Sequence, residues 1–281
     1  MEIGAFLIVE AELKQDTTFL CLRLDLILIR LLYRLFLGDI FDIVKIMEKG
    51  FWGKLNKPVR QAQGKPIFAL APMADVTDEA FRRIIAKYGR PDVTWTEFVS
   101  CDGLCSKGKP KLMNILAYSE EERPIVAQFF GAKPENFYKC AELAQELGFD
   151  GIDINMGCPD RAINKQMAVA DLINNPELAK EIILATKRGA GKIPVSVKTR
   201  VGYNKENLDE WLKNLLETEP TAITVHARTR KELSLVPARW ELVKRAKEIA
   251  KGTETLILGN GDVADLKDAY FKADETGADG V

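Results

Sequence analysis

The chain has 281 residues, of which 47% are hydrophobic and 29% are charged, and its formal net charge is −1. These values are typical of a globular protein and exclude a uniformly basic nucleic-acid binder, so any contact with nucleic acid requires a local cationic patch. The single histidine excludes a multi-histidine metal site, and the five scattered cysteines contain no CxxC pair. Cys101 and Cys105 form a CxxxC spacing, which is a weak metal signal without a second pair, and we expect a reducing, cytoplasmic location without a disulfide framework.

The first 46 residues differ in composition from the rest of the chain. Residues 18–37 are very apolar, but four charged residues interrupt them, so the uncharged stretch is shorter than a membrane span and no stable membrane association is expected. An amphipathic helix that packs on the main domain or lies on a membrane surface is one interpretation. The other, which the composition favours, is that 1–46 is a helical extension foreign to the protein. Met47 then begins the main domain, 47–281.

From residue 66 onward, short β-branched runs alternate with helical patterns, as βα units require. Seven strands are expected, at Pro66–Met73, Val93–Val99, Pro124–Phe130, Gly151–Met156, Ile193–Thr199, Ala222–His226 and Thr255–Gly259.

Apolar stripes mark the helices between these strands. One stripe contains Phe81, Ile84, Ile85 and Tyr88, a second runs from Leu178 to Ala185, and a third contains Leu208, Trp211, Leu212 and Leu215. Asn175-Pro176 provides an N-cap and a first turn for the second of these helices.

This α/β alternation predicts a (β/α)8 TIM barrel rather than an open sheet, because polar residues cluster after the strand ends. No GxGxxG motif opens a helix after the first strand, which argues against a dinucleotide-binding sheet. The eighth strand is expected to begin near Gly280-Val281, so the pattern predicts a barrel whose last strand is missing from this sequence.

The run Gly151–Gln166 predicts a buried strand that ends in a proline-stiffened turn carrying a thiol. Asn155 and Cys158 are three residues apart and are expected to point into one cleft. A cysteine at such a position can act as a nucleophile, a metal ligand or a proton donor, or it can be an inert core residue.

The other predicted strand ends supply amides, cations and an apolar floor. A barrel places these side chains at one end, where they suit a flat polar heterocycle with a phosphate tail. The carboxylates are too few for a paired-carboxylate hydrolase or for a hard-cation cage, so no metal is expected. The residues in chain order are Pro72, Met73, Ala74, Glu97, Gln128, Asn155, Cys158, Lys198, Arg200, His226, Arg228, Asn260, Gly261 and Asp262.

Seven segments of the sequence resemble the tRNA-dihydrouridine synthases. In order they read APMADVTDEAFR, TEFVS, AQFFG, DINMGCPDRAINK, VSVKTRVGY, ITVHARTR and ILGNGDV. The resemblance implies an FMN-binding barrel that reduces the C5–C6 double bond of uridine in tRNA, with NADPH as the reductant. It also implies that the family's C-terminal helical domain lies beyond this sequence.

The resemblance assigns roles to individual residues. Cys158 would be the general acid that protonates C5 while flavin N5 delivers hydride to C6, and Asn155 and His226 would orient the flavin and the uracil. The expected FMN-binding residues are Pro72, Met73, Ala74, Gln128, Lys198, His226, Asn260, Gly261 and Asp262.

A tRNA substrate implies base flipping and cationic contacts to phosphate. Arg161 and Arg228 are the expected substrate contacts with Asn155, because they adjoin predicted site residues, and the protein is expected to be a monomer. Other cations that could contact phosphate, or simply form a solvated face, are Lys107, Lys109, Lys111, Lys165, Arg230 and Lys231. The family's glycine/alanine-rich stretch after the cysteine motif reads Met167–Asp171 here, which bears on substrate access. Two alternatives stay open: a flavin barrel that reduces a small molecule, and an inactive remnant that binds RNA.

Overall fold

The computed structural model describes residues 50–55, 65–160 and 168–281. The chain divides into two units, Met1–Met47 and Glu48–Val281, and every described residue belongs to the second. The N-terminal segment 1–46 and Arg161 therefore lie outside the described residues.

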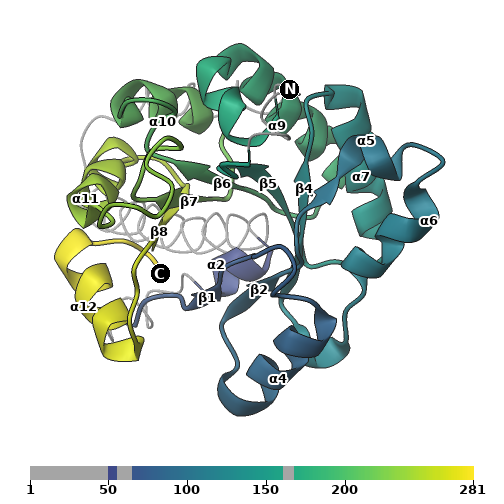
Figure 1. The fold of residues 1–281 in the computed structure, drawn as a ribbon, viewed down its shortest axis with the longest axis horizontal. Coiled ribbons are helices and arrows are strands. Elements are labelled where there is room, and N and C mark those ends of the chain that lie inside the picture. The colour runs from purple at the N-terminus through teal and green to yellow at the C-terminus, as the bar shows by residue number, and fades with distance from the viewer. Residues whose placement is uncertain (1–49, 56–64, 161–167) are drawn as a thin grey trace, which may run out of the picture. The chain divides into compact units, whose positions relative to one another are not determined.

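Parallel strands form the centre of the domain (Figure 1). They pair in the order β1-β2-β4-β5-β6-β7-β8, with the short β3 on β4, as the sequence predicts for a TIM-barrel-like α/β fold. The strands are β1 (Ala69–Leu70), β2 (Val93–Trp95), β3 (Val99–Ser100), β4 (Ile125–Phe130), β5 (Gly151–Met156), β6 (Val195–Arg200), β7 (Ala222–His226) and β8 (Leu256–Asn260).

The last residues of the chain lie between the first and last strands of this sheet. Gly280 bridges in parallel to Ile67 on one side and to Leu258 on the other. The Val281 N–H donates to the Ile67 carbonyl at 2.8 Å, and the Gly259 N–H donates to the Gly280 carbonyl at 2.9 Å. The expected start of an eighth strand near Gly280 is thus present as a short bridge that touches both edges.

Helices surround the strands and follow them in sequence (Figure 1). Asn175 accepts a hydrogen bond from the Leu178 N–H and Pro176 opens the following helix, as predicted. The helices are α2 (Phe51–Leu55), α4 (Glu79–Gly89), α5 (Cys101–Leu104), α6 (Lys109–Leu112), α7 (Pro134–Glu146), α9 (Pro176–Ala190), α10 (Leu208–Leu216), α11 (Trp240–Ile249) and α12 (Leu266–Thr276), with 3-10 turns η1 (Met113–Leu116), η2 (Glu120–Glu122) and η3 (Val169–Asn174).

Helix α2 packs at the end of the sheet where the strands begin. Trp52 is buried in a cluster with Trp95, and their ring centroids are 6.0 Å apart. A Cβ on Gly151, the first residue of β5, would lie 3.0 Å from the Phe51 ring. This end is therefore filled with aromatic side chains, which leaves the opposite end, where the strands finish, for the site.

Helix α4 corrects one expectation about burial. Its apolar stripe predicts a buried face, but Ile84 and Tyr88 are 58% and 80% exposed, and Arg82 is the residue that is buried. The helix begins where Asp78 accepts a hydrogen bond from the Phe81 N–H. The sequence thus located the helix correctly, but only Phe81 and Ile85 of its apolar stripe are partly buried.

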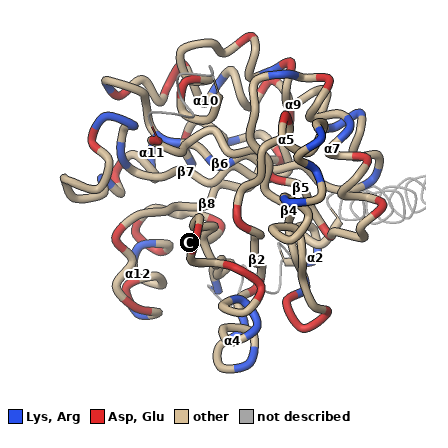
Figure 2. The backbone as a smooth tube through the Cα atoms, turned by 45° about the vertical axis from the view of Figure 1, so that its right-hand side comes forward, with Lys and Arg blue, Asp and Glu red and all other residues tan. Residues whose placement is uncertain are grey.

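Charged residues of both signs are interspersed along the outer helices (Figure 2). This mixture agrees with the near-zero net charge of the sequence. Within the described ranges, no helix is long and apolar enough to cross a membrane.

Candidate active site

The turn that carries Cys158 is held by the side chain of Asn155. The Asn155 Oδ1 accepts hydrogen bonds from the backbone N–H groups of Gly157 and Cys158, both at 3.0 Å. Asn155 in turn donates to the Gln128 Oε1 at 3.1 Å. The amide of Asn155 therefore fixes the backbone of the turn that carries the thiol.

Arg200 supports the same turn from the neighbouring strand β6. Its Nε donates to the Gly157 carbonyl at 2.7 Å, and its Nη1 donates to the carbonyls of Thr229 and Leu233 at 3.1 Å. Burial raises the pKa of the Cys158 thiol, and this effect exceeds the opposing influence of the Arg200 and Lys198 charges. The group is consequently a protonated thiol at neutral pH.

Lys198 lies at the end of β6 and reaches across β7 to β8. Its Nζ donates to the Asn260 Oδ1 at 3.1 Å. Burial, followed by the positive charge of Arg200, lowers the pKa of Lys198 to about 8. Because the Lys198 ammonium is removed from water, it can form a strong hydrogen bond to an electron-rich group of a ligand.

His226 at the end of β7 is held as a neutral imidazole. Arg228 Nη1 lies 3.2 Å from His226 Nε2, so the imidazole accepts there. Burial and the charges of Lys198, Arg200 and Arg228 lower the pKa of His226 to about 2. The ring is thus a hydrogen-bonding group rather than a cation in this cluster.

Arg228 is largely committed to partners within the chain. Its Nη2 donates to both carboxylate oxygens of Asp262, and its Nε donates to the Val236 carbonyl at 2.6 Å. The side chain is 7% exposed. Gly261, between Asn260 and Asp262, has φ +124°, and a Cβ there would lie 3.2 Å from the His226 ring, so a glycine is required.

Below these groups, the interior of the barrel contains a polar network. Gln128 Nε2 donates to Asp153 Oδ2 at 2.7 Å, and the Ser196 hydroxyl donates to Asp153 Oδ1 at 2.5 Å. Burial raises the pKa of Asp153 to about 6. Gln128 is fully buried and its amide already bonds Asp153 and Asn155, so the structure places it beneath the site residues.

The loop after β1 carries Pro72, Met73 and Ala74, the expected apolar floor. Met73 is 43% exposed. The loop is closed from inside by buried Thr77, whose Oγ1 accepts from the Met73 N–H at 2.9 Å and donates to the Met73 carbonyl at 3.1 Å. The Asp75 N–H donates to Glu97 Oε1 at 2.6 Å, which ties the loop to the segment after β2.

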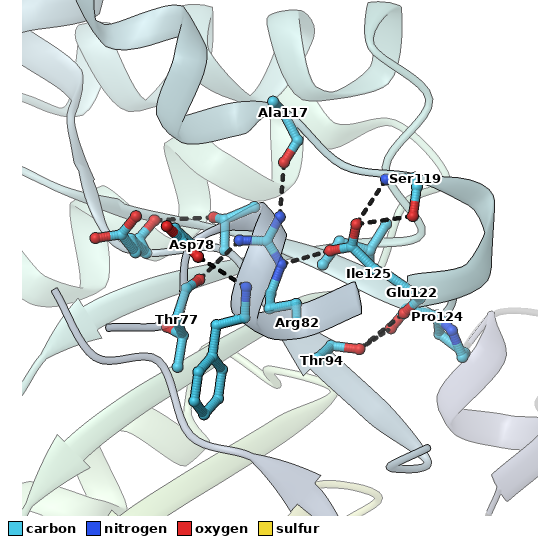
Figure 3. Close-up of polar contacts among 12 residues, drawn as sticks. Thr77, Asp78, Arg82, Thr94, Ala117, Ser119, Glu122, Pro124 and Ile125 are labelled. Carbon is cyan, nitrogen blue, oxygen red and sulfur yellow. Dashed lines mark hydrogen bonds and ion pairs between the residues drawn. The ribbon is translucent and has the colours of Figure 1, made fainter. Parts of the chain in front are cut away.

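A buried ion pair anchors this loop from behind (Figure 3). Arg82 Nε donates to Glu122 Oε2 at 2.5 Å, and both side chains are fully buried. Two further N–H groups of Arg82 donate to the carbonyls of Thr77 and Ala117, at 2.8 and 2.6 Å. Ser119 donates to the other oxygen of Glu122. Both charges therefore have a partner inside the protein.

Positive φ angles occur outside glycine in four of the loops that follow strands. Asp75, Val169, Leu233 and Asp262 have φ angles of 59°, 52°, 53° and 52°. Aspartate tolerates this region, whereas a β-branched residue rarely adopts it. Val169 is fully buried and lies in the Met167–Asp171 stretch that departs from the glycine-rich pattern, so the chain keeps a left-handed conformation there without a glycine.

The donor set at the strand ends fits a flavin mononucleotide. The ammonium of Lys198 and the amide of Asn260 can bind a polar ring edge, while Gly261 lets backbone approach closely. Exposed Met73 and Ala74 provide an apolar surface at the same end of the sheet. The described residues contain no cluster of three or more histidine, cysteine or acidic side chains suited to a metal ion.

The sequence predicts no role for two groups of this site. It places Arg200 at a strand end, and Asp153 is not among the expected residues. The strand period of two puts Asp153 on the same face as Asn155, and Arg200 on the same face as Lys198, which is the signal that could have identified both.

The chain matches one protein family and is similar to proteins that are named as probable tRNA-dihydrouridine synthases. The family described as "Dihydrouridine synthase (Dus)" matches residues 69–281. The chain is similar to a "Probable tRNA-dihydrouridine synthase" of Staphylococcus aureus (strain COL), with 41% identity over 84% of this chain and 70% of that protein. It is equally similar, at 41% identity and with the same coverage, to a "Probable tRNA-dihydrouridine synthase 2" of Bacillus subtilis (strain 168).

Among solved structures, the chain resembles an old yellow enzyme homologue from Zymomonas mobilis. The TM-score is 0.53 and the sequence identity 12%, over 77% of this chain and 84% of that one. At this identity the likeness supports the barrel architecture only.

Proposed function

The chain belongs to the dihydrouridine synthase family, and we propose that it reduces uridine in tRNA to 5,6-dihydrouridine, with FMN as cofactor and NADPH as reductant. The observation that carries the proposal is the convergence of Cys158, Lys198 and His226 at the ends of β5, β6 and β7. Bound FMN would supply the hydride that adds to C6 of the uracil ring.

Cys158 acts in this proposal as the general acid that gives a proton to C5. Hydride addition to a conjugated carbonyl creates enolate charge, so the neighbouring carbon must receive a proton. The raised pKa of Cys158 keeps the proton on sulfur at neutral pH. Asn155 and Arg200 position the thiol through the backbone of its turn.

The remaining residues of the site hold ligands. Lys198 and Asn260 would bind the polar edge of the flavin, and Met73 would provide an apolar contact to its ring. Neutral His226, whose Nε2 accepts from Arg228, would donate a hydrogen bond from Nδ1 without adding charge. Arg228 and Asp262 together keep the loop after β7 in place near the phosphate end.

The tRNA contacts in this proposal come from exposed lysines. Lys107, Lys109 and Lys111 are exposed in the segment after β3. Such cations contact phosphates and give affinity that falls with salt, while the flipped uridine enters the site. We propose that the protein acts in the cytoplasm, where it meets its tRNA substrate.

The Cys158→Ala variant tests the proposed acid. We expect near-complete loss of dihydrouridine formation in tRNA, while NADPH still reduces the bound flavin at the wild-type rate. Cys105→Ala, which removes an exposed thiol from a different segment, is the matched control and should leave both rates unchanged. Equal tRNA activity in Cys158→Ala would disprove the acid role.

A separate measurement tests the substrate. Dihydrouridine is quantified in tRNA from cells that lack the gene and from cells that regain it. A level that does not change between the two would refute tRNA as the substrate. Flavin absorbance of the purified protein, which should be yellow, tests the cofactor independently of the substrate.

A further inference from the structure

Three cysteines that are far apart in sequence meet between helices α5 and α7. Cys101 begins α5, Cys105 follows its last residue, and Cys140 lies in the middle of α7. Cys101 and Cys140 are buried, and Cys105 is exposed. The CxxxC spacing thus acquires a third thiol from the next βα unit, which the proposed reaction does not use.

Reciprocal contacts bring Cys105 and Cys140 to the same spot. The Cys101 carbonyl accepts the Cys105 N–H at 3.0 Å, and the Cys140 Sγ lies 3.9 Å from that same oxygen. In return, the Cys105 Sγ lies 3.9 Å from the carbonyl of Asn136, one helical turn before Cys140. Each sulfur therefore contacts backbone adjacent to the other.

A polar clamp keeps the two helices in this register. Asn136 on α7 donates to Asp102 on α5, and Lys133 lies 3.7 Å from the same carboxylate. A Cβ on Gly131, just before α7, would lie 3.4 Å from the Cys101 Cβ, which shows how closely the segments pack. The thiols therefore meet in a fixed arrangement.

We propose that Cys105 and Cys140 form a reversible disulfide, which makes this α5–α7 contact a site of thiol oxidation on the protein. A metal site is the alternative for clustered thiols, but the described residues contain no group suited to hold one.

Solvent exposure decides which of the two cysteines reacts first. Exposed Cys105 attacks one sulfur of oxidised glutathione, whose S–S bond breaks, so that one glutathione leaves as a thiol and the other stays on Cys105. Cys140 then attacks the Cys105 sulfur and the second glutathione leaves. Two protein thiols lose two electrons and two protons, and one glutathione disulfide becomes two glutathione thiols.

The electrostatics of the cluster suit Cys140 for the second step. A hydrogen bond from Cys101 lowers the pKa of Cys140, and this effect exceeds the opposing effect of burial. The charge of Lys109 also lowers the pKa, while Asp102 opposes it. The hydrogen bond from Cys105 contributes only until glutathione occupies that sulfur. Burial raises the pKa of Cys101, so Cys101 stays a thiol and stabilises its neighbour. Partial burial raises the pKa of Cys105, so its exposure and not its thiolate character favours it in the first step, whereas the thiolate of the second step forms on Cys140.

The test treats the full-length protein with excess oxidised glutathione at neutral pH, followed by peptide mapping by mass spectrometry. Cleavage after glutamate separates Cys140 from Cys158, because Glu142 and Glu146 lie between them. We expect a cross-linked Cys105–Cys140 peptide without bound glutathione, the loss of two titratable thiols, and full recovery of both after dithiothreitol.

Two variants make the result decisive. Cys140→Ser should stop at the first step and accumulate glutathione on Cys105. Cys101→Ser, which removes the third thiol of the cluster, should still form the cross-link. A wild-type protein that keeps glutathione on Cys105, that remains unmodified, or that joins Cys101 to Cys140 would overturn the proposal.

Discussion

Two buried arginines, Arg82 and Arg200, show how differently this chain treats a charge in its interior. Both donate to backbone carbonyls, Arg82 to two and Arg200 to three. Arg82 also bonds the Glu122 carboxylate, whereas every hydrogen bond described for Arg200 runs to a neutral carbonyl. Burial and the neighbouring Arg228 lower the pKa of Arg200 to about 10.

The difference separates a structural charge from one that is poised for a ligand. A buried charge is costly unless it is paired, and the Arg82–Glu122 pair supplies its own partner. Burial lowers the pKa of Lys198 and of His226 first, and the positive charge of Arg200 lowers both further. We infer that a ligand with anionic or electron-rich groups completes that region.

Breaking the pair at Arg82 should give the largest loss of stability. Arg82→Leu leaves the Glu122 carboxylate buried without its counter-ion, which we expect to cost about 3–5 kcal/mol in the free energy of unfolding. Urea denaturation measures this loss. The double variant Arg82→Leu/Glu122→Leu removes both charges and should recover part of it, and a single variant as stable as the wild type would refute the structural role.

Removing Lys198 should weaken cofactor binding more than it affects folding. Hydrogen bonds to charged groups contribute about 1.5–3 kcal/mol, so Lys198→Met should bind FMN roughly 10–100-fold more weakly in a fluorescence titration. The matched control is Lys187→Met on α9, because Lys187 also donates to carbonyls but lies away from the strand ends. Unchanged affinity in Lys198→Met would count against the proposed flavin contact.

The pH dependence of the free energy of unfolding reports on the single histidine, His226, which lies among these cations. The pKa of His226 is lowered to about 2 in the folded chain, against about 6.5 when unfolded, so between these values only the unfolded chain holds the proton. Stability should therefore fall as the pH drops below about 6.5, by up to about 1.4 kcal/mol per pH unit from this group. Asp153, whose pKa is raised to about 6, contributes with the opposite sign between about 6 and 4.

Nuclear magnetic resonance of the imidazole protons checks this directly. The His226 resonances should show no titration near pH 6.5 in the folded protein, and Lys198→Met should raise the pKa of His226 because one neighbouring positive charge is gone. In His226→Gln, the fall in stability below pH 6.5 should be smaller. A normal titration of the wild-type histidine would contradict its burial among these cations.

The smallest effect is expected at an ion pair on the surface. Arg245 pairs with Asp209, and both side chains are about half exposed, at 49% and 50%. Solvent screens such pairs, so Arg245→Ala should leave the denaturation midpoint within the spread of repeated measurements. A shift as large as that of Arg82→Leu would show that the exposed ion pair stabilises the fold as much as the buried one.

Pattern reasoning predicted much of the barrel but little of what anchors it. The strands Gly151–Met156 and Ala222–His226 have their predicted bounds, whereas the first strand is reduced to Ala69–Leu70. Local sequence carries the period of a strand, but the length that is paired depends on neighbours. Helix α4 shows the same limit, because the burial of Arg82 depends on Glu122, 40 residues away.

The sequence by itself determined the order of βα units, the residues at the strand ends and the family to which they belong, because strand periodicity and short motifs are local properties. Only the tertiary structure decided that Gln128 lies beneath the site, that Arg200 holds the Cys158 turn and that Cys140 joins the CxxxC pair. These contacts join segments tens of residues apart, and their geometry follows from how the strands and helices pack rather than from any one stretch of chain.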